Sequence, residues 1–283
     1  MDFMREISVN KIRDSVRDLC ISSNYYIGSD VKDSLINYRD RENYPIAKEV
    51  LGKIVENADI SRNENMPMCQ DTGMACIFLE VGQDVHFIDG DIEEAINEGV
   101  RRGYEEGYLR KSVVKDPIDR VNTKDNTPAV IYYNLVKGDK VKVTVAPKGF
   151  GSENMSKIAM LKPSDGLEGV KKFILKTVEE AGPNPCPPMI VGVGIGGTFD
   201  KAAYLSKKAL LRPINEENKN EFYAQLEKDL LKDINSLGIG PQGFGGLTTA
   251  LGINIEVYPT HIAGLPVAVN ISCHATRHKE AVI

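Results

Sequence analysis

Apolar residues recur at two different spacings along this chain, and the two spacings limit the folds it can adopt. In residues 12–20 and 46–55 they lie three to four positions apart, which predicts amphipathic helices. In residues 141–145 valine alternates with lysine or threonine, as in a half-exposed strand. Further helical spacing over 90–103 and 170–180 indicates that helices and strands are mixed along the whole chain.

The remaining segments support the same mixed class. Residues 75–87, ACIFLEVGQDVHF, predict a pair of strands, and 189–197, MIVGVGIGG, predict one apolar strand followed by two helices up to about residue 237. Residues 247–273 are rich in strand formers. Because no repeat, low-complexity tract or linker separates these parts, we expect one compact α+β unit over residues 1–283, with helices packed on mixed β-sheets.

Composition excludes several classes of function. The 283 residues include 35 basic and 40 acidic side chains, and no long run of Lys and Arg is present, so a nucleic-acid partner is not expected. The charged N-terminus lacks the apolar run of a signal peptide, and no stretch approaches the length of a membrane span. We therefore expect a cytoplasmic protein without a membrane partner.

A glycine pattern typical of dinucleotide-binding sites needs separate consideration. Gly192, Gly194 and Gly197 match G-x-G-x-x-G between an apolar strand and a predicted helix. Such a site also requires an acidic residue at the end of the next strand, where it can reach the ribose. Glu216 and Glu217 have the right separation but lie in a segment of helical spacing. An NAD-dependent oxidoreductase is therefore only a remote alternative.

The five cysteines fall into two groups. Cys20 completes a helical face and Cys76 lies in an apolar run, which favours the core for both. Cys69 opens the polar motif CQDTG, Cys186 lies in PNPCPPM, and Cys273 ends an apolar strand just before HATRH. These last three stand at junctions between regular elements, where loops can converge on one point.

Three converging thiolates are compatible with two kinds of metal site. A structural zinc usually takes four ligands and uses closely spaced cysteine pairs, which this chain lacks. An iron–sulfur cubane with three cysteine ligands leaves one iron open as a Lewis acid, which can stabilise a departing hydroxide. The alternatives are thus a cluster-dependent dehydration enzyme and a zinc-stabilised binding module.

Four long motifs identify a family. CQDTG, GFGSENMSKIAMLKPSDG, PCPPMIVGVGIGGTFDKA and GPQGFGGLTTALGINIEVYPTHIAGLPVAVNISCHATRH occur in this order. Together they resemble the α subunit of the iron–sulfur (class I) fumarate hydratases and L-tartrate dehydratases, over nearly the whole chain from about Ile46. The resemblance implies a catalytic domain of the Fe–S hydro-lyase α type. It also implies a [4Fe-4S] cluster held by Cys69, Cys186 and Cys273.

The first motif contains the candidate general acid. The resemblance implies that Asp71 donates a proton to the hydroxyl of the substrate and that Gln70 lies beside the substrate. The competing explanation for Asp71 is an Asx turn formed with Thr72 and Gly73. A carboxylate next to a metal ligand is often catalytic, which favours the functional role.

Further candidates come from three other segments. Arg110, in LRKSVV, resembles a substrate-binding arginine, and a guanidinium can hold a carboxylate through two parallel bonds; the competing role is a solvated helix end. Gly151 of KGFGSEN resembles a glycine that contacts substrate, although plain turn chemistry also explains glycines at 149 and 151. His261 matches a histidine at the substrate, and His274 and His278 are at most outer residues of the site.

One catalytic group is missing from these motifs. Trans elimination needs a base on the face opposite the departing hydroxyl, and no candidate for it is evident here. The resemblance implies that a separate β subunit supplies the base, in an α2β2 assembly. The expected reaction is the reversible hydration of fumarate to (S)-malate, with L-tartrate dehydration as the alternative.

Overall fold

The computed structural model describes residues 4–283. Their contacts divide the chain into two compact units. Unit 1 contains the described part of 1–27 together with Ala58–Gly149 and Arg277–Ile283, and unit 2 contains Gly28–Asn57 and Phe150–Thr276. Each unit has helices on a four-stranded sheet, which confirms the α+β class. The expectation that residues 1–283 act as one catalytic domain stays a prediction.

Unit 1 combines two long helices with the sheet β10-β5-β2-β4. Strand β2 pairs parallel with β4 and antiparallel with β5, and β10 pairs antiparallel with β5. The long helix α3 (Pro45–Glu64) contributes residues to both units. The other elements of unit 1 are β1 (Arg5–Ser8), α1 (Val9–Tyr25), β2 (Met74–Gly82), β3 (Val85–Ile88), α4 (Ile92–Glu106), β4 (Val130–Val136), β5 (Val141–Lys148) and β10 (Lys279–Val282).

The expected strand pair over residues 75–87 forms two strands that do not pair with each other. β3 instead pairs parallel with β1 in a separate two-stranded sheet. The backbone N–H groups of Gly82, Gln83 and Asp84 bond to the carbonyls of Lys140, Val136 and Gly138. Because these bonds continue the existing ladder, the chain passes onward into β3 instead of reversing into a hairpin.

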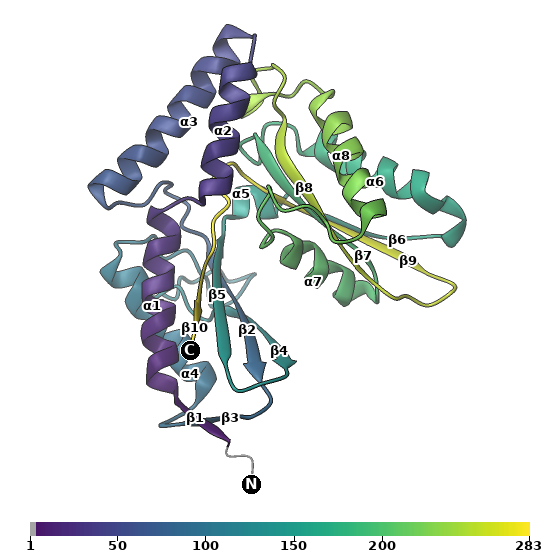
Figure 1. The fold of residues 1–283 in the computed structure, drawn as a ribbon. Coiled ribbons are helices and arrows are strands. Elements are labelled where there is room, and N and C mark those ends of the chain that lie inside the picture. Colours follow the sequence, from purple (N-terminus) through teal and green to yellow (C-terminus); the bar gives the residue numbers. More distant parts are fainter. Residues whose placement is uncertain (1–3) are drawn as a thin grey trace. The chain divides into compact units, whose positions relative to one another are not determined.

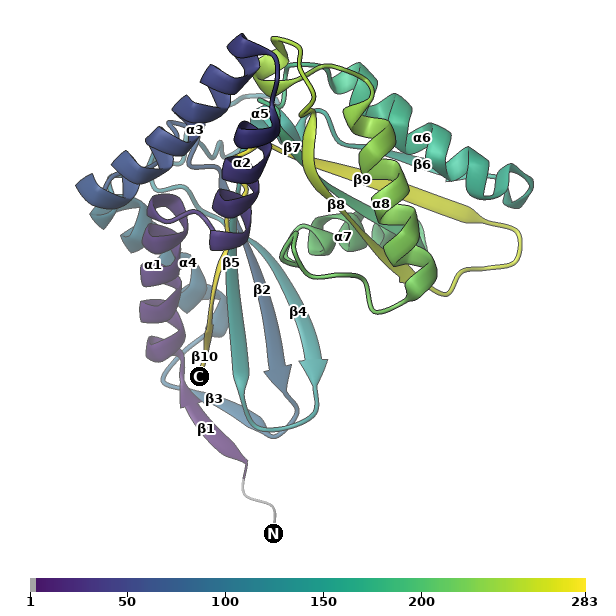
Figure 2. The same ribbon diagram turned by 45° about the horizontal axis from the view of Figure 1, so that its top comes forward.

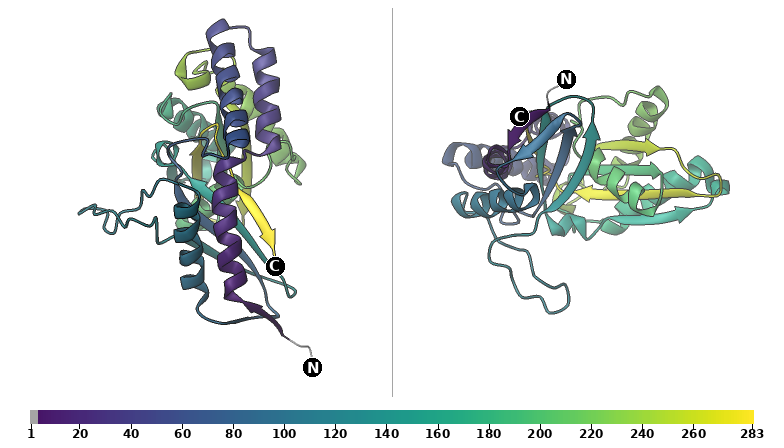
Figure 3. Two further views of the ribbon diagram at one scale, coloured as in Figure 1. Left: turned by 90° about the vertical axis from the view of Figure 1, so that its left-hand side faces the viewer. Right: turned by 90° about the horizontal axis from the view of Figure 1, so that it is seen from below.

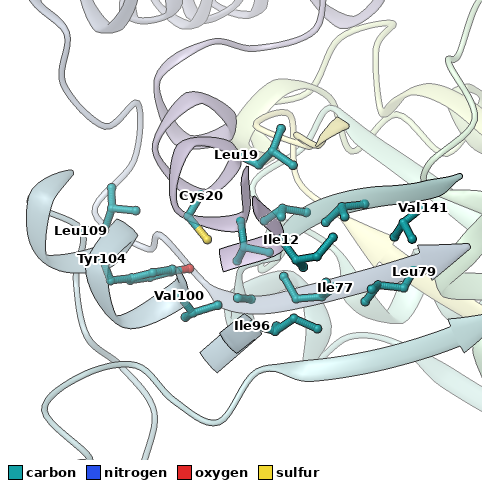
Figure 4. Packing of buried hydrophobic residues seen from close by; sticks show 14 of the residues in the cluster. Ile12, Leu19, Cys20, Ile77, Leu79, Ile96, Val100, Tyr104, Leu109 and Val141 are labelled. Atoms are coloured by element: carbon teal, nitrogen blue, oxygen red, sulfur yellow. The ribbon is translucent and has the colours of Figure 1, made fainter. Parts of the chain in front are cut away.

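Helices α1 and α4 lie side by side in unit 1 (Figure 3). They pack so closely because α4 presents glycines to α1: a Cβ on Gly99 would lie 2.5 Å from the carbonyl oxygen of Arg13, and one on Gly103 would lie 2.8 Å from Cβ of Cys20. Figure 4 shows Cys20 within this core, which lies against β2 and β5. Cys20 is fully buried in this cluster, as expected of a core residue, and this burial raises the pKa of its thiol.

Close packing at Gly103 leads to a stability prediction. Gly103→Ala should lower the free energy of unfolding by about 1–3 kcal/mol, because the added methyl overpacks the contact with α1. Gly52 is the matched control, since a Cβ there meets nothing nearer than 4.0 Å. Gly52→Ala should raise stability by about 0.5–1 kcal/mol through helix propensity. Urea unfolding measures both, and a shift of the same sign in the two variants would contradict the packing argument.

Unit 2 has a three-layered arrangement around the sheet β6-β9-β7-β8. Helix α7 covers one face, and α6 and α8 pack on the other (Figure 1, Figure 2). The elements of this unit, besides the first part of α3, are α2 (Ser29–Arg41), α5 (Phe150–Glu153), β6 (Lys157–Leu161), the 3-10 turn η1 (Pro163–Asp165), α6 (Gly166–Ala181), β7 (Met189–Gly196), α7 (Phe199–Ala209), α8 (Glu221–Asn235), the 3-10 turn η2 (Pro241–Gly243), β8 (Ala250–Tyr258) and β9 (Leu265–Ser272).

The glycine pattern of β7 has a packing explanation. A Cβ on Gly192 would lie 2.1 Å from the carbonyl oxygen of Ser206, and one on Gly194 would lie 2.2 Å from that of Ala202. Both acceptors belong to α7, so glycine is needed for this helix to approach the sheet. Glu216 and Glu217 lie between α7 and α8, not at the end of a strand. The nicotinamide alternative therefore has no support in the fold.

Two kinds of element were not anticipated from local patterns. α2 occupies a segment without a clear helical spacing of apolar residues and buries only Val31 and Leu35. Strands β4, β6 and β10 lie at sheet edges, where pairing depends on a distant partner strand. Within residues 4–283 no helix has the length and apolar character needed to cross a membrane.

Candidate functional site

The CQDTG motif forms the loop between α3 and β2 in unit 1. Cys69 and Asp71 are half-buried, and Gln70 is exposed. Oδ1 of Asp71 accepts a hydrogen bond of 3.1 Å from the backbone N–H of Gly73, so the Asx turn considered for this carboxylate is present. The turn uses Oδ1; the other oxygen, Oδ2, lies toward Gly149, where a Cβ would come within 3.0 Å of it.

Buried side chains of unit 1 donate hydrogen bonds to the backbone carbonyls of this loop. The hydroxyl of Tyr104 lies 2.8 Å from the carbonyl oxygen of Thr72 and 3.0 Å from that of Gly73. Burial raises the pKa of Tyr104 well above its usual value, so the hydroxyl remains a donor. Nδ2 of Asn126 donates to the same Gly73 oxygen at 3.2 Å. The carbonyls of the motif are thereby turned toward the interior of unit 1.

Arg277 completes this support. Its Nη2 donates to the carbonyl oxygen of Asp71 at 2.7 Å, and its Nε donates to Oδ1 of Asn24 at 3.1 Å. Its side chain is buried, as is that of Lys148, which precedes Gly149. No local pattern distinguishes a residue that supports a distant loop from an ordinary core or surface residue, so the sequence alone did not reveal Tyr104, Asn126, Lys148 and Arg277.

Arg110 is tied to the CQDTG loop through its main chain. It follows the end of α4 by four residues and is exposed, and its carbonyl oxygen accepts a hydrogen bond of 3.0 Å from Oγ1 of Thr72. Arg110 thus lies just beyond the helix end, and its role at a substrate stays a prediction. Arg101, in contrast, lies on α4 and pairs with Glu98 and Asp125, which makes it a structural surface charge.

Two of the three candidate cysteines lie together in unit 2. Cys186, in the loop before β7, is exposed, and Cys273, in the loop after β9, is half-buried. The carbonyl oxygen of Cys186 lies 3.0 Å from Nδ1 of His274 and accepts a longer bond of 3.4 Å from the backbone N–H of His274. The PNPCPPM and SCHATRH segments are thus hydrogen-bonded to each other.

The GFGSEN segment forms only a short helix. Gly151 lies inside α5, a helix of only four residues, and does not precede a longer helix whose dipole could hold an anion. A Cβ on Gly151 would meet its nearest neighbour, the carbonyl oxygen of Asn184, at an ordinary 3.8 Å. The Glu153 carboxylate of this segment pairs with Lys207 and accepts a hydrogen bond from Asn270 at 3.1 Å.

His261 lies in the turn between β8 and β9 and is exposed. Its Nδ1 accepts a hydrogen bond of 3.2 Å from the backbone N–H of Ala263. The whole of β9 separates it from Cys273, so the two residues lie at opposite ends of this strand. Its role at a substrate stays a prediction.

Nearly the whole chain is similar to proteins of one known family. The model of the family described as "Fumarate hydratase (Fumerase)" matches residues 13–282. This chain belongs to the fumarate hydratase family. A putative L(+)-tartrate dehydratase subunit alpha of Methanocaldococcus jannaschii is 45% identical over 273 residues, covering 94% of this chain and 95% of the relative. The L(+)-tartrate dehydratase subunit alpha of Escherichia coli K12 is 33% identical over 277 residues, covering 96% and 91%. The chain is accordingly of the hydro-lyase type.

The thiols of this fumarate hydratase family member fit an iron–sulfur cluster by their chemistry. All five cysteines carry thiols, and two of them, Cys20 and Cys76, are buried in the core. The other three are exposed or half-buried in loops, where a thiolate can be reached by iron. Among residues 4–283 no three His, Cys, Asp or Glu side chains are gathered closely enough to hold a metal ion. Cys69 and the unit 2 cysteines belong to different units, so their joint role stays a prediction.

Proposed function

We propose that this chain is the α subunit of a [4Fe-4S]-dependent fumarate hydratase that interconverts fumarate plus water and (S)-malate. Family membership over residues 13–282 carries the proposal. The hydrogen-bonded loops of Cys186 and Cys273 support it, because they bring two candidate ligands into one part of unit 2. Cys69, Cys186 and Cys273 would hold the cluster, which when bound supplies a Lewis-acidic iron for the substrate hydroxyl.

The protein side chains would bind the substrate and move a proton. In the dehydration direction, Asp71 would give a proton to the departing hydroxyl, since its carboxylate lies in a half-buried loop beside a candidate ligand. Gln70 and Gly151 would contact the substrate, and Arg110 would neutralise one of its two carboxylates. His261 would also act at the substrate, as the resemblance implies, and within one chain it lies at the opposite end of β9 from Cys273.

The proposal also includes a partner. Relatives are named as alpha subunits, and the motifs of this chain offer no base for the carbon-bound proton. We infer that a β subunit supplies this base in an α2β2 assembly, and that the enzyme works in the cytoplasm.

L-tartrate dehydration is the second candidate, because the relatives with 45% and 33% identity carry that name. The deciding experiment is anaerobic co-expression with a β chain, followed by assays on fumarate, (S)-malate and both tartrate enantiomers. Turnover of fumarate and (S)-malate would support the proposal, and turnover of L-tartrate alone would replace it with the second candidate. A cluster-loaded α subunit that hydrates fumarate at full rate by itself would refute the need for a β partner.

The role of Arg110 can be tested by kinetics. Arg110→Gln should raise KM for the dicarboxylate about 10–100-fold, because a charge-assisted hydrogen bond contributes about 1.5–3 kcal/mol. Arg110→Lys should recover only part of this, since an ammonium cannot form the two parallel bonds. Lys111→Gln is the control and should leave KM unchanged; equal effects at both positions would indicate a general loss of charge.

A further inference from the structure

The motif GPQGFGG contains a residue whose contacts the proposed function does not explain. Gln242, in η2, has a φ of +53°, in the left-handed region that residues with side chains seldom adopt. From this conformation it bonds twice to one acceptor: its backbone N–H donates to the carbonyl oxygen of Pro187 at 2.8 Å, and its Nε2 donates to the same oxygen at 2.9 Å. Strained residues persist where the surroundings hold them, often at functional sites.

The preceding carbonyl of the chain is held by a second residue. The oxygen of Cys186 lies 3.0 Å from Nδ1 of His274. A carbonyl oxygen can only accept, so the ring donates to it in the form protonated at Nδ1, and the backbone N–H of His274 also lies 3.4 Å from this oxygen. Nε2 of Gln242 lies 3.2 Å from the same nitrogen, so the two side chains pack against each other. Gln242 and His274 therefore hold two successive carbonyls, those of Cys186 and Pro187.

The surrounding segments fix this arrangement further. A Cβ on Gly243, whose φ is +79°, would lie 2.5 Å from Cβ of Pro183, so η2 lies directly on the turn that carries Cys186. On the other side, the backbone N–H and Oγ1 of Thr276 donate to the carbonyl oxygen of Cys273 at 3.0 and 2.8 Å. Cys186 itself has a φ of +55°, so its backbone also depends on external support.

We propose that Gln242 and His274 are positioning residues that hold the Cys186 and Cys273 loops in the arrangement that binds the cluster. The proposal rests on the proposed function for the identity of the bound group. The two side chains act through hydrogen bonds to the backbone of the Cys186 loop, and their removal should affect retention of iron more than the chemistry on the substrate.

The first test uses the α chain co-expressed with its β subunit and loaded without oxygen. Gln242→Gly removes the side chain while it keeps the backbone donor and relieves the left-handed conformation, and His274→Ala removes the second donor. Both variants should lose iron to a chelator about tenfold faster than the unmodified protein, since partners that orient metal ligands typically change affinity by about 10–100-fold. Turnover per bound cluster should stay unchanged, which a general structural defect would not produce.

Two matched variants sharpen this result. His274→Asn places an amide donor near the position of Nδ1 and should restore retention to within about threefold of the unmodified protein. Gln225→Ala removes an exposed glutamine of α8 in the same unit and should have no effect. Equal rates of iron loss for Gln242→Gly and the unmodified protein would overturn the proposal.

A second measurement does not depend on the cluster. In the cluster-free protein, amide hydrogen exchange of the peptide covering residues 183–189 should be about fivefold faster in Gln242→Gly, while peptides from α8 are unchanged. Unchanged exchange would overturn the positioning role. If the unmodified protein took up no iron and exchange still accelerated, the proposed function would fail while the positioning role would stand.

Discussion

Replacement of Cys69, Cys186 or Cys273 by serine is expected to abolish cluster binding. Each variant should lose most of its iron and acid-labile sulfide, and activity with the proposed β subunit should fall by at least about a hundredfold, because the Lewis-acidic iron of the proposed cluster would be lost. Iron and sulfide analysis, visible absorbance and turnover of (S)-malate on anaerobically prepared protein measure these changes.

The two other cysteines are the controls for this experiment. Cys20 lies in the packed core between α1 and α4, and Cys76 is buried on β2. Cys20→Ala and Cys76→Ala should reduce stability to some extent but keep the iron content per folded chain. Iron retention in Cys186→Ser together with iron loss in Cys76→Ala would reject the ligand assignment. A fourth protein side chain bonded to the cluster would contradict the proposal that one iron has an open position.

Asp71→Asn should lower kcat by about 10²–10⁴-fold, the usual contribution of a general acid. The substitution keeps an oxygen that can accept the N–H of Gly73, so the Asx turn should survive and the iron content should not change. Steady-state kinetics and iron analysis on the same preparation separate the two effects.

Asp116 offers a matched control in the same unit. Its Oδ1 also accepts backbone N–H groups, from Ile118 and Asp119, but it lies in an exposed loop. Asp116→Asn should leave kcat within about twofold, because a turn of this kind tolerates asparagine. If Asp71→Asn kept full kcat with a full cluster, Asp71 would be a turn residue only.

The spacing of apolar residues predicted the helices and strands that bury a continuous set of their own side chains. α1, α4 and α6 each bury one continuous face, and β7 is a short apolar run, so local spacing identifies them. Strand β4 was missed because Tyr133 and Leu135 are exposed and, within the described residues, it pairs in its sheet with β2 alone. α2 was missed because two buried side chains make too weak a periodicity.

In the candidate site, too, some features follow from the local sequence and others only from tertiary contacts. The sequence by itself determined the family, the five thiols and their division into core and loop residues, because these depend on neighbouring residues and on motifs of fixed order. Only the tertiary structure decided that the glycines of β7 serve helix packing, that Tyr104 and Arg277 hold the CQDTG backbone, and that His261 lies at the opposite end of β9 from Cys273. Each of these depends on atoms brought together from distant parts of the chain, and no local spacing of residues encodes such contacts.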